Sequence, residues 1–199
     1  TLFYILLFVL SGFFMFSLKK INKKETVSKI ELERIHLRAN NLKTMINSNS
    51  KYNKKIAFLV DMKISSAKNR FFVYDLENNK ILDKGLVAHG SGSETGIKGE
   101  LKFSNIPNSK CTSLGKYSIG QKYNGMFGRS YRLSGLDKTN NKAFERAIVL
   151  HYYSTVPYEE QESYISNSYG CPMVNEQFFK RIEKIIDNSK SKIILDIYY

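Results

Sequence analysis

Apolar and polar positions alternate in short segments from residue 56 onward, a pattern typical of β-strands. It predicts strands at 56–61, 70–76, 81–88, 116–120, 130–133, 147–153 and 192–198. The turn residues Glu77, Asn78 and Asn79 predict a hairpin between the second and third strands. One helix is expected after Asn175, with an apolar face of Phe178, Phe179, Ile182, Ile185 and Ile186. The pattern therefore predicts a mostly β domain at 56–199.

The first eighteen residues are patterned differently. Residues 2–18 are apolar except for Ser11, Gly12 and Ser17, a length at the lower edge of what spans a bilayer. Segment 1–18 is therefore predicted to be a membrane-anchor helix or a signal peptide. An uncleaved anchor is favoured, because no small-x-small cleavage site precedes the lysine run. The run at 19–24 contains four lysines, and the positive-inside rule would hold that end of the segment in the cytoplasm.

Residues 19–55 are polar and strongly basic. Eleven Lys or Arg face three Glu, so this stretch contributes +8 of the net charge of +13. Val27, Ile30, Ile35, Leu42 and Ile46 keep an approximate helical spacing, and Thr26 or Ser28 is placed to cap the helix start. We predict a basic helical linker, exposed to solvent, that separates the anchor from the domain.

Composition restricts the classes of partner and cofactor but does not select one function. The 199 residues suffice for one domain with extensions, and the excess positive charge favours polyanionic surroundings such as nucleic acid, anionic lipid or an acidic cell-wall polymer. No nucleic-acid-binding motif is recognisable, and much of the charge lies in the linker. Two cysteines, Cys111 and Cys171, are too few for a zinc site or a disulfide framework, so no metal or cofactor is expected.

The segment around Cys171 favours nucleophilic chemistry. Cys171 follows Gly170 on a predicted turn ahead of a capped helix, and glycine lets a substrate carbonyl approach the backbone. The N–H groups of Gly170 and Cys171 are candidate oxyanion donors. A buried structural cysteine fits this segment equally well. His151 lies in an apolar strand 20 residues earlier. Its presence favours a nucleophilic Cys171 over a structural one, because a thiol needs a base to become a thiolate. We expect an imidazolium at His151 to lower the pKa of Cys171.

Several segments, in order, resemble the murein branch of the L,D-transpeptidase catalytic domain family. They are Val87-Ala88-His89-Gly90, Phe103-Ser104-Asn105, Ser113-Leu114-Gly115-Lys116-Tyr117, Ser130 to Leu136, Arg146 to His151, and Ser168-x-Gly170-Cys171-Pro172. The resemblance implies a β-sandwich or barrel-like catalytic fold with one or two short helices. It also implies a cell-envelope location and peptidoglycan stem peptides as substrate, without a cofactor and without nucleic acid.

The resemblance implies that Cys171 attacks the bond between the third residue and D-Ala of a tetrapeptide stem, with His151 as base. A thioester acyl-enzyme forms, and an amine from a neighbouring stem resolves it into a crosslink. Substrate contacts are expected from His89, Arg132, Tyr152, Ser168 and Tyr169.

Three positions depart from the family pattern. Tyr152 replaces the glycine after the catalytic histidine, Tyr169 replaces a histidine two residues before the cysteine, and Asn167 replaces an arginine. These changes leave open an L,D-carboxypeptidase or amidase that uses water as acceptor. An inactive peptidoglycan-binding relative is also left open. Protein partners are not predicted.

Overall fold

The computed structural model describes residues 27–126 and 128–199. The predicted segment 1–18 and the start of the linker lie outside the described residues. Among the described residues, neither helix combines the length and apolar content needed to cross a bilayer.

Nine strands form one sheet in the order β3-β2-β1-β9-β5-β6-β7-β8-β4. The strands are β1 (Tyr52–Asp61), β2 (Phe71–Asp75), β3 (Lys80–Gly85), β4 (Val87–Ala88), β5 (Gly115–Gly125), β6 (Gly128–Gly135), β7 (Val149–Tyr152), β8 (Met173–Val174) and β9 (Lys192–Tyr198). The helices are α2 (Lys29–Asn47), α3 (Glu176–Asp187) and the short 3-10 helix η1 (Ser91–Ser93). The predicted mostly β fold is thus confirmed for the described residues.

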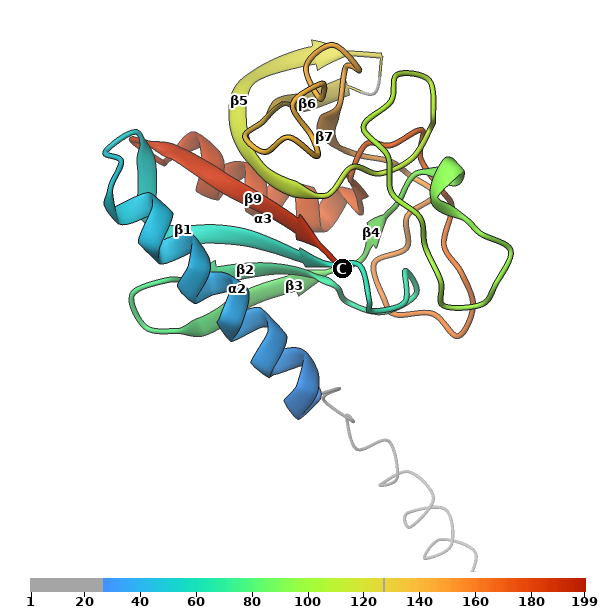
Figure 1. The fold of residues 1–199 in the computed structure, drawn as a ribbon, viewed down its shortest axis with the longest axis horizontal. Coiled ribbons are helices and arrows are strands. Elements are labelled where there is room, and N and C mark those ends of the chain that lie inside the picture. Colours follow the sequence, from blue (N-terminus) through green and yellow to red (C-terminus); the bar gives the residue numbers. More distant parts are fainter. Residues whose placement is uncertain (1–26, 127) are drawn as a thin grey trace, which may run out of the picture.

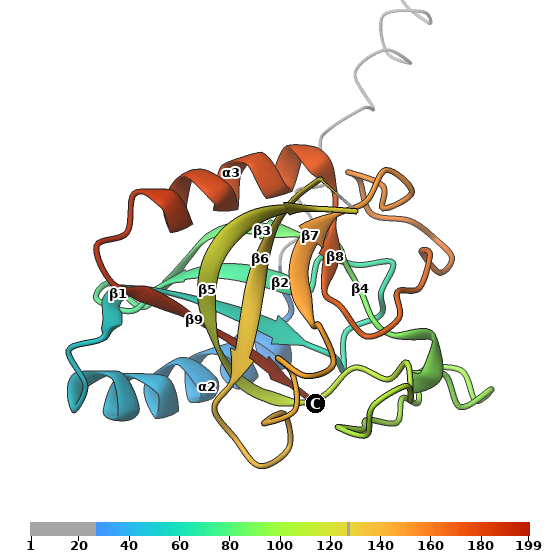
Figure 2. The ribbon, with the colours of Figure 1, turned by 90° about the horizontal axis from the view of Figure 1, so that it is seen from above.

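The two long helices cover opposite faces of the sheet (Figures 1 and 2). Alternate residues of β1 serve two apolar cores: Phe58 and Val60 face the core that contains α3, while Ala57 and Leu59 face the core that contains α2. A strand buried on both faces must be apolar throughout, which explains the continuous run at 56–60. Strands β5, β6 and β7 curl over the α3 side (Figure 2).

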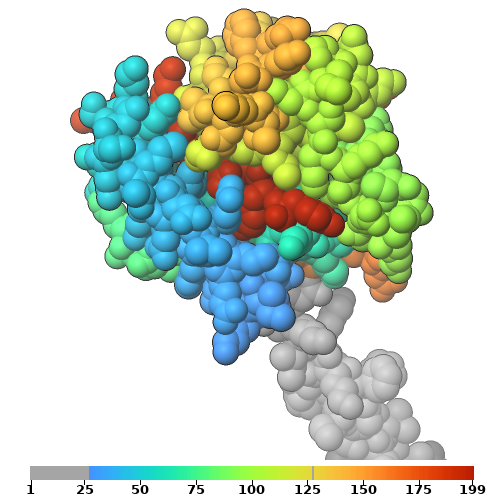
Figure 3. Space-filling view, viewed as in Figure 1, coloured from blue at the N-terminus to red at the C-terminus, as the bar shows by residue number. Residues whose placement is uncertain are grey.

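The helix predicted in the basic segment is confirmed as α2, but its predicted exposure to solvent is wrong. Ile35, Ala39, Leu42 and Ile46 of α2 are fully buried in the second core, and Figure 3 shows the helix lying directly on the domain. Of the two predicted capping residues, Ser28 caps α2, and it does so through a capping box. The helix therefore belongs to the folded domain, and only its outer face is solvated.

Two of the basic residues of α2 neutralise buried acids. Arg34 pairs with Asp61 of β1 at 2.8 Å, and Arg38 pairs with Asp196 of β9. Both carboxylates lie on the side of the sheet that α2 covers, and both are almost completely buried. The arginines are one helical turn apart, so a single face of α2 contributes both the apolar contact and the two ion pairs.

The strand predicted at 81–88 divides in two. β3 pairs with β2 as the predicted hairpin, but β4 leaves that partner and pairs with β8 at the far end of the sheet order. The residues that follow β4 therefore lie beside the segment that leads into β8. This crossing is what brings His89 and Gly90 next to Ser168.

Candidate active site

Cys171 lies beside the strand that carries His151. Strands β7 and β8 are parallel neighbours, and His151 lies opposite Met173. Two residues earlier in each chain segment, Cys171 therefore lies opposite Val149. The N–H of Val149 donates to Cys171 Sγ at 3.4 Å, and the carbonyl oxygen of Ala147 is 3.9 Å from the same sulfur. Cys171 is partly exposed and not in a disulfide. His151 thus lies in β7, and Cys171 lies two residues before its parallel neighbour β8.

The contacts of His151 define its tautomer. Its Nδ1 is 3.0 Å from the carbonyl oxygen of Tyr152, which only accepts, so Nδ1 carries the proton and Nε2 carries the lone pair. The ring is 1% exposed, and this burial lowers the pKa of His151 below 6.5. Because a backbone carbonyl fixes the ring and burial keeps it neutral, His151 has the form that a general base requires.

The electrostatics of Cys171 differ from the expectation. Burial raises the pKa of the Cys171 thiol above its ordinary value, and the Val149 N–H and the charge of Arg146 oppose this shift only in part. The predicted lowering by an imidazolium at His151 is therefore wrong. Both shifts favour a neutral thiol and a neutral imidazole over a thiolate and an imidazolium.

Arg146 joins the backbone segments on either side of Cys111. Its Nη2 donates to the carbonyl oxygen of Cys111 at 2.6 Å, and its Nη1 donates to Ser104 O at 3.0 Å and Ser113 Oγ at 3.1 Å. Ser113 Oγ lies 2.7 Å from the hydroxyl of Tyr117, whose burial raises its pKa to about 12. Sequence reasoning gave Arg146 no role, although it opens the segment that ends at His151.

Gly170 is required by its conformation and by its neighbours. Its φ is +115°, and a Cβ there would lie 2.8 Å from the carbonyl oxygen of Cys111. Its N–H donates to Ser168 Oγ at 3.0 Å, which occupies one of the two predicted oxyanion donors. The N–H of Cys171 is the other predicted donor. Gly170 thus acts by letting the loop pass close to Cys111.

The predicted substrate contacts divide into exposed and inward-facing side chains. Tyr169 is 75% exposed, with Lys110 Nζ 4.9 Å from its ring centre, and exposed Arg132 stacks 4.6 Å from the ring centre of Tyr123. Ser168 is buried and holds Gly170. The ring of Tyr152 packs on Phe179 at 5.6 Å, on the opposite face of β7 from His151. Of these four, Tyr169 and Arg132 are exposed, Tyr152 is partly exposed and Ser168 is buried.

His89 lies in a separate buried network. Arg70 Nη2 donates to His89 Nδ1 at 2.9 Å, so the proton of His89 is on Nε2, which faces Glu94 Oε1 at 2.6 Å. Burial and the neighbouring charge of Arg70 lower the pKa of His89, although Glu94 opposes the shift. With its lone pair occupied by Arg70, His89 is not placed to act as a base for Cys171.

The described residues therefore form a mostly β domain in which Cys171, two residues before β8, contacts the N–H of Val149 in β7, the strand that carries His151. The chain belongs to the L,D-transpeptidase catalytic domain family, whose model matches residues 26–195. This confirms the resemblance found in the sequence and includes α2 within the family domain. The family acts on peptidoglycan stem peptides. Among curated proteins, none matches the chain.

Solved structures give a more distant similarity. An L,D-transpeptidase from Xylanimonas cellulosilytica is 13% identical with a TM-score of 0.40, covering 72% of this chain and 60% of that one. One from Mycobacterium tuberculosis is 12% identical with a TM-score of 0.37, covering 73% and 58%. One from Stackebrandtia nassauensis is 14% identical with a TM-score of 0.44, covering 91% and 75%. The chain thus spans less than two thirds of the first two structures, and the assignment rests on the family match.

Proposed function

We propose that the chain is a peptidoglycan L,D-transpeptidase that crosslinks stem peptides through an acyl-enzyme on Cys171. The observation that carries this proposal is the placement of Cys171 Sγ, two residues before β8, against the N–H of Val149 in β7, the strand that holds a neutral, Nδ1-protonated His151. A neutral base beside a neutral thiol suits concerted deprotonation and attack.

In the first step, Cys171 Sγ attacks the carbonyl carbon of the bond between the third residue and D-Ala of a donor stem. The thiol proton moves to His151 Nε2, and the N–H of Cys171 stabilises the oxyanion. The tetrahedral intermediate collapses, the C–N bond breaks, and the D-Ala amine leaves with the proton from His151. A thioester remains on Cys171.

In the second step, an amine from a neighbouring stem attacks the thioester carbonyl and gives its proton to His151. The C–S bond breaks, the proton returns to sulfur, and the product is a new amide crosslink. Water in place of the amine would give an L,D-carboxypeptidase. Tyr152 and Tyr169, which depart from the family pattern, are the positions at which the acceptor preference is expected to differ.

Incubation of the protein with purified muropeptides, followed by mass spectrometry, tests the proposal. We expect crosslinked dimers with loss of D-Ala from the wild-type protein and from Cys111→Ser. Cys171→Ser and His151→Ala should lose turnover by at least about two orders of magnitude. A carbapenem should add its mass to Cys171 only. Turnover by folded Cys171→Ser would refute the nucleophile, and shortened stems without dimers would favour the hydrolytic alternative. An inactive relative would show neither product.

The location is part of the same proposal. Stem peptides are crosslinked outside the cytoplasm, so we infer that the domain lies in the cell envelope and that segment 1–18 anchors or exports it. The four lysines at 19–24 oppose this orientation by the positive-inside rule. A C-terminal phosphatase fusion that is active only after export tests the side. A stable but inactive fusion would contradict the inferred location.

A further inference from the structure

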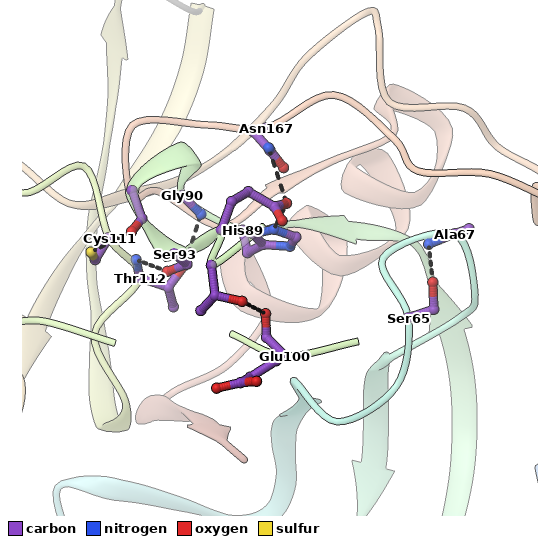
Figure 4. Close-up of polar contacts among 12 residues, drawn as sticks. Ser65, Ala67, His89, Gly90, Ser93, Glu100, Cys111, Thr112 and Asn167 are labelled. Carbon is purple, nitrogen blue, oxygen red and sulfur yellow. Dashed lines mark hydrogen bonds and ion pairs between the residues drawn. The ribbon is translucent and has the colours of Figure 1, made fainter. Parts of the chain in front are cut away.

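A cavity lies away from Cys171. It has a volume of about 330 Å³ and is lined by the loop after β1, the loop after η1 and residues 162–164; neither Cys171 nor His151 lines it. This volume is within the roughly 300–1,000 Å³ of small-molecule sites. Figure 4 shows part of its surroundings, including Ser65, His89 and Glu100.

Arg70 lines this cavity as a buried cation without a bonded carboxylate. It is fully buried, and it donates to the carbonyl oxygens of Val87 and Ile64 and to His89 Nδ1. These contacts account for four of its five N–H groups and leave one on Nη1. Burial lowers the pKa of Arg70 to about 9, so the group stays charged at neutral pH. Asp61 and Glu94 partly oppose this shift without bonding to Arg70, so the remaining N–H favours an anionic ligand group.

Ser66 supplies a second polar group to the same cavity. Its side chain is 3% exposed, and its hydroxyl has no hydrogen-bond partner among the described residues. A buried hydroxyl without a partner destabilises the folded chain, because it has lost its hydrogen bonds to water. A ligand oxygen that accepts from Ser66 would remove this cost. The inner part of the cavity therefore offers a cation and an unused donor.

Acidic as well as basic side chains line the rest of the cavity. Glu100 and Glu162 line the cavity, and no ion pair engages either carboxylate among the described residues; Lys63 and Lys98 also line it. Within the described residues, no group of three or more His, Cys, Asp or Glu is arranged to hold a metal ion. The acidic side chains therefore fit an organic ammonium group better than a metal.

We propose that this cavity binds a small zwitterion, either a free amino acid or a short peptide with free termini. The ligand carboxylate lies toward Arg70 and Ser66, and its ammonium lies toward Glu100 and Glu162. The site is distinct from Cys171 and does not depend on the proposed reaction.

The cavity shares one wall with the segment that carries the nucleophile. Glu94 lines the cavity and accepts hydrogen bonds at the same oxygen from His89 and from Asn167, at 2.6 and 3.2 Å (Figure 4). Asn167 is four residues before Cys171, and the N–H of Ser168 donates to His89 O at 2.8 Å. A ligand that moves Glu94 would thus act directly on the loop before Cys171.

Calorimetric titration of the whole chain tests the proposal. The probes are D-alanine, L-alanine and D-alanyl-D-alanine, with N-acetyl-D-alanine and D-alaninamide as partners that each lack one charged group. We expect saturable binding of at least one zwitterion, and affinity at least about tenfold weaker once either charge is removed. Comparison of the alanine probes with D-alanyl-D-alanine distinguishes a free amino acid from a short peptide. No saturable binding by any zwitterion would overturn the proposal.

Two variants connect the binding to the named residues. Ser66→Ala should weaken binding about fivefold or more, and should raise the melting temperature of the ligand-free protein, because the unsatisfied hydroxyl is gone. Glu162→Gln should weaken the zwitterions but not N-acetyl-D-alanine. Ser118→Ala is the matched control, since Ser118 has a buried hydroxyl without a partner but lies outside the cavity. Cys171→Ser should bind normally. Unchanged affinity in Ser66→Ala and Glu162→Gln, or lost affinity in Cys171→Ser, would contradict the assignment.

Discussion

Arg38 holds Asp196 through two hydrogen bonds, from Nε to Oδ2 at 3.0 Å and from Nη2 to Oδ1 at 2.9 Å. This bidentate pair joins the first described helix to the last strand, 158 residues later. Asp196 is 1% exposed, and its burial raises its pKa despite the opposing effect of Arg38. A carboxylate in such a position needs its partner, because it is buried and the nearby Lys116 favours its charged form less than Arg38 does.

Arg38→Ala should destabilise the domain by an amount at the low end of the about 3–5 kcal/mol typical of broken buried pairs, since Arg38 itself is partly exposed. Urea unfolding followed by fluorescence measures the change. Lys55→Ala breaks the exposed pair with Glu77 and should cost at most about 1 kcal/mol. Equal effects of the two substitutions would mean that Asp196 is not held by Arg38.

A chain that begins at Lys51 should fail to fold stably. It lacks the fully buried Ile35, Leu42 and Ile46, each worth about 1.5–3 kcal/mol, which together approach the whole stability of a typical domain. It also leaves Asp61 and Asp196 without their arginines. A chain that begins at Val27 is the control and should unfold cooperatively. Cooperative unfolding of the shorter chain would contradict the role of α2.

His89 and His151 should be found in opposite tautomers. Nitrogen-15 NMR should show the proton on Nε2 of His89 and on Nδ1 of His151, because the first accepts from Arg70 at Nδ1 and the second donates there to Tyr152 O. Both rings should titrate below 6.5, since burial lowers both pKa values. The same tautomer for both rings would contradict the assigned contacts.

The lowered histidine pKa values also set the sign of a stability change. The unfolded chain binds more protons than the folded one between the folded pKa values and 6.5, so these two groups make stability fall as the pH decreases through that window. Asp196 acts in the opposite sense, because its pKa is raised from 3.8. Denaturation at pH 7.5 and 5.5 should therefore show lower stability at pH 5.5.

Cys171 should alkylate as a thiol with a raised pKa. Its reaction with iodoacetamide at pH 7 should be slower than that of free cysteine and should still be increasing at pH 9. His151→Ala should leave this profile unchanged while abolishing turnover, because His151 acts during attack and not on the resting thiol. Cys111→Ser removes the other thiol and serves as the control background. A profile below that of free cysteine, raised by His151→Ala, would instead indicate a thiolate–imidazolium pair.

Gly170→Ala should disturb the site more than an ordinary glycine substitution. The new Cβ adds a collision with Cys111 O to the backbone strain of about 1–3 kcal/mol. Gly96→Ala separates the two effects, because Gly96 also has positive φ but has open space around its α-carbon. We expect Gly170→Ala to lose both stability and turnover relative to Gly96→Ala. Equal behaviour would show that the close approach to Cys111 is unimportant.

The strands and the late helix were predictable because their signals are local. β9 has the predicted range 192–198, and Asn175 caps α3 as expected. The burial of α2 was not predictable in the same way. Its basic residues resemble a solvated face, and only the opposing Asp61 and Asp196, distant in sequence, show that two of them neutralise buried acids.

The site was predicted in part for a similar reason. Cys171 and His151 belong to ordered motifs, whereas Arg146 acts through carbonyl groups whose positions no motif records. The same holds for His89, whose partner Arg70 is 19 residues away. Hydrogen bonds to backbone atoms and contacts between distant loops leave little trace in a single sequence.

The position of β9 between β1 and β5 has a consequence for how the chain acquires its structure. The last strand to be synthesised is the one that joins the two halves of the sheet, in parallel with the first strand and antiparallel to the fifth. An incomplete nascent chain can form the β1–β2–β3 and β5–β6 hairpins but leaves two strand edges unpaired. Such edges favour association with other chains. Folding of the domain is therefore expected to wait until β9 has left the ribosome, and to be slow because its central pairing is long-range.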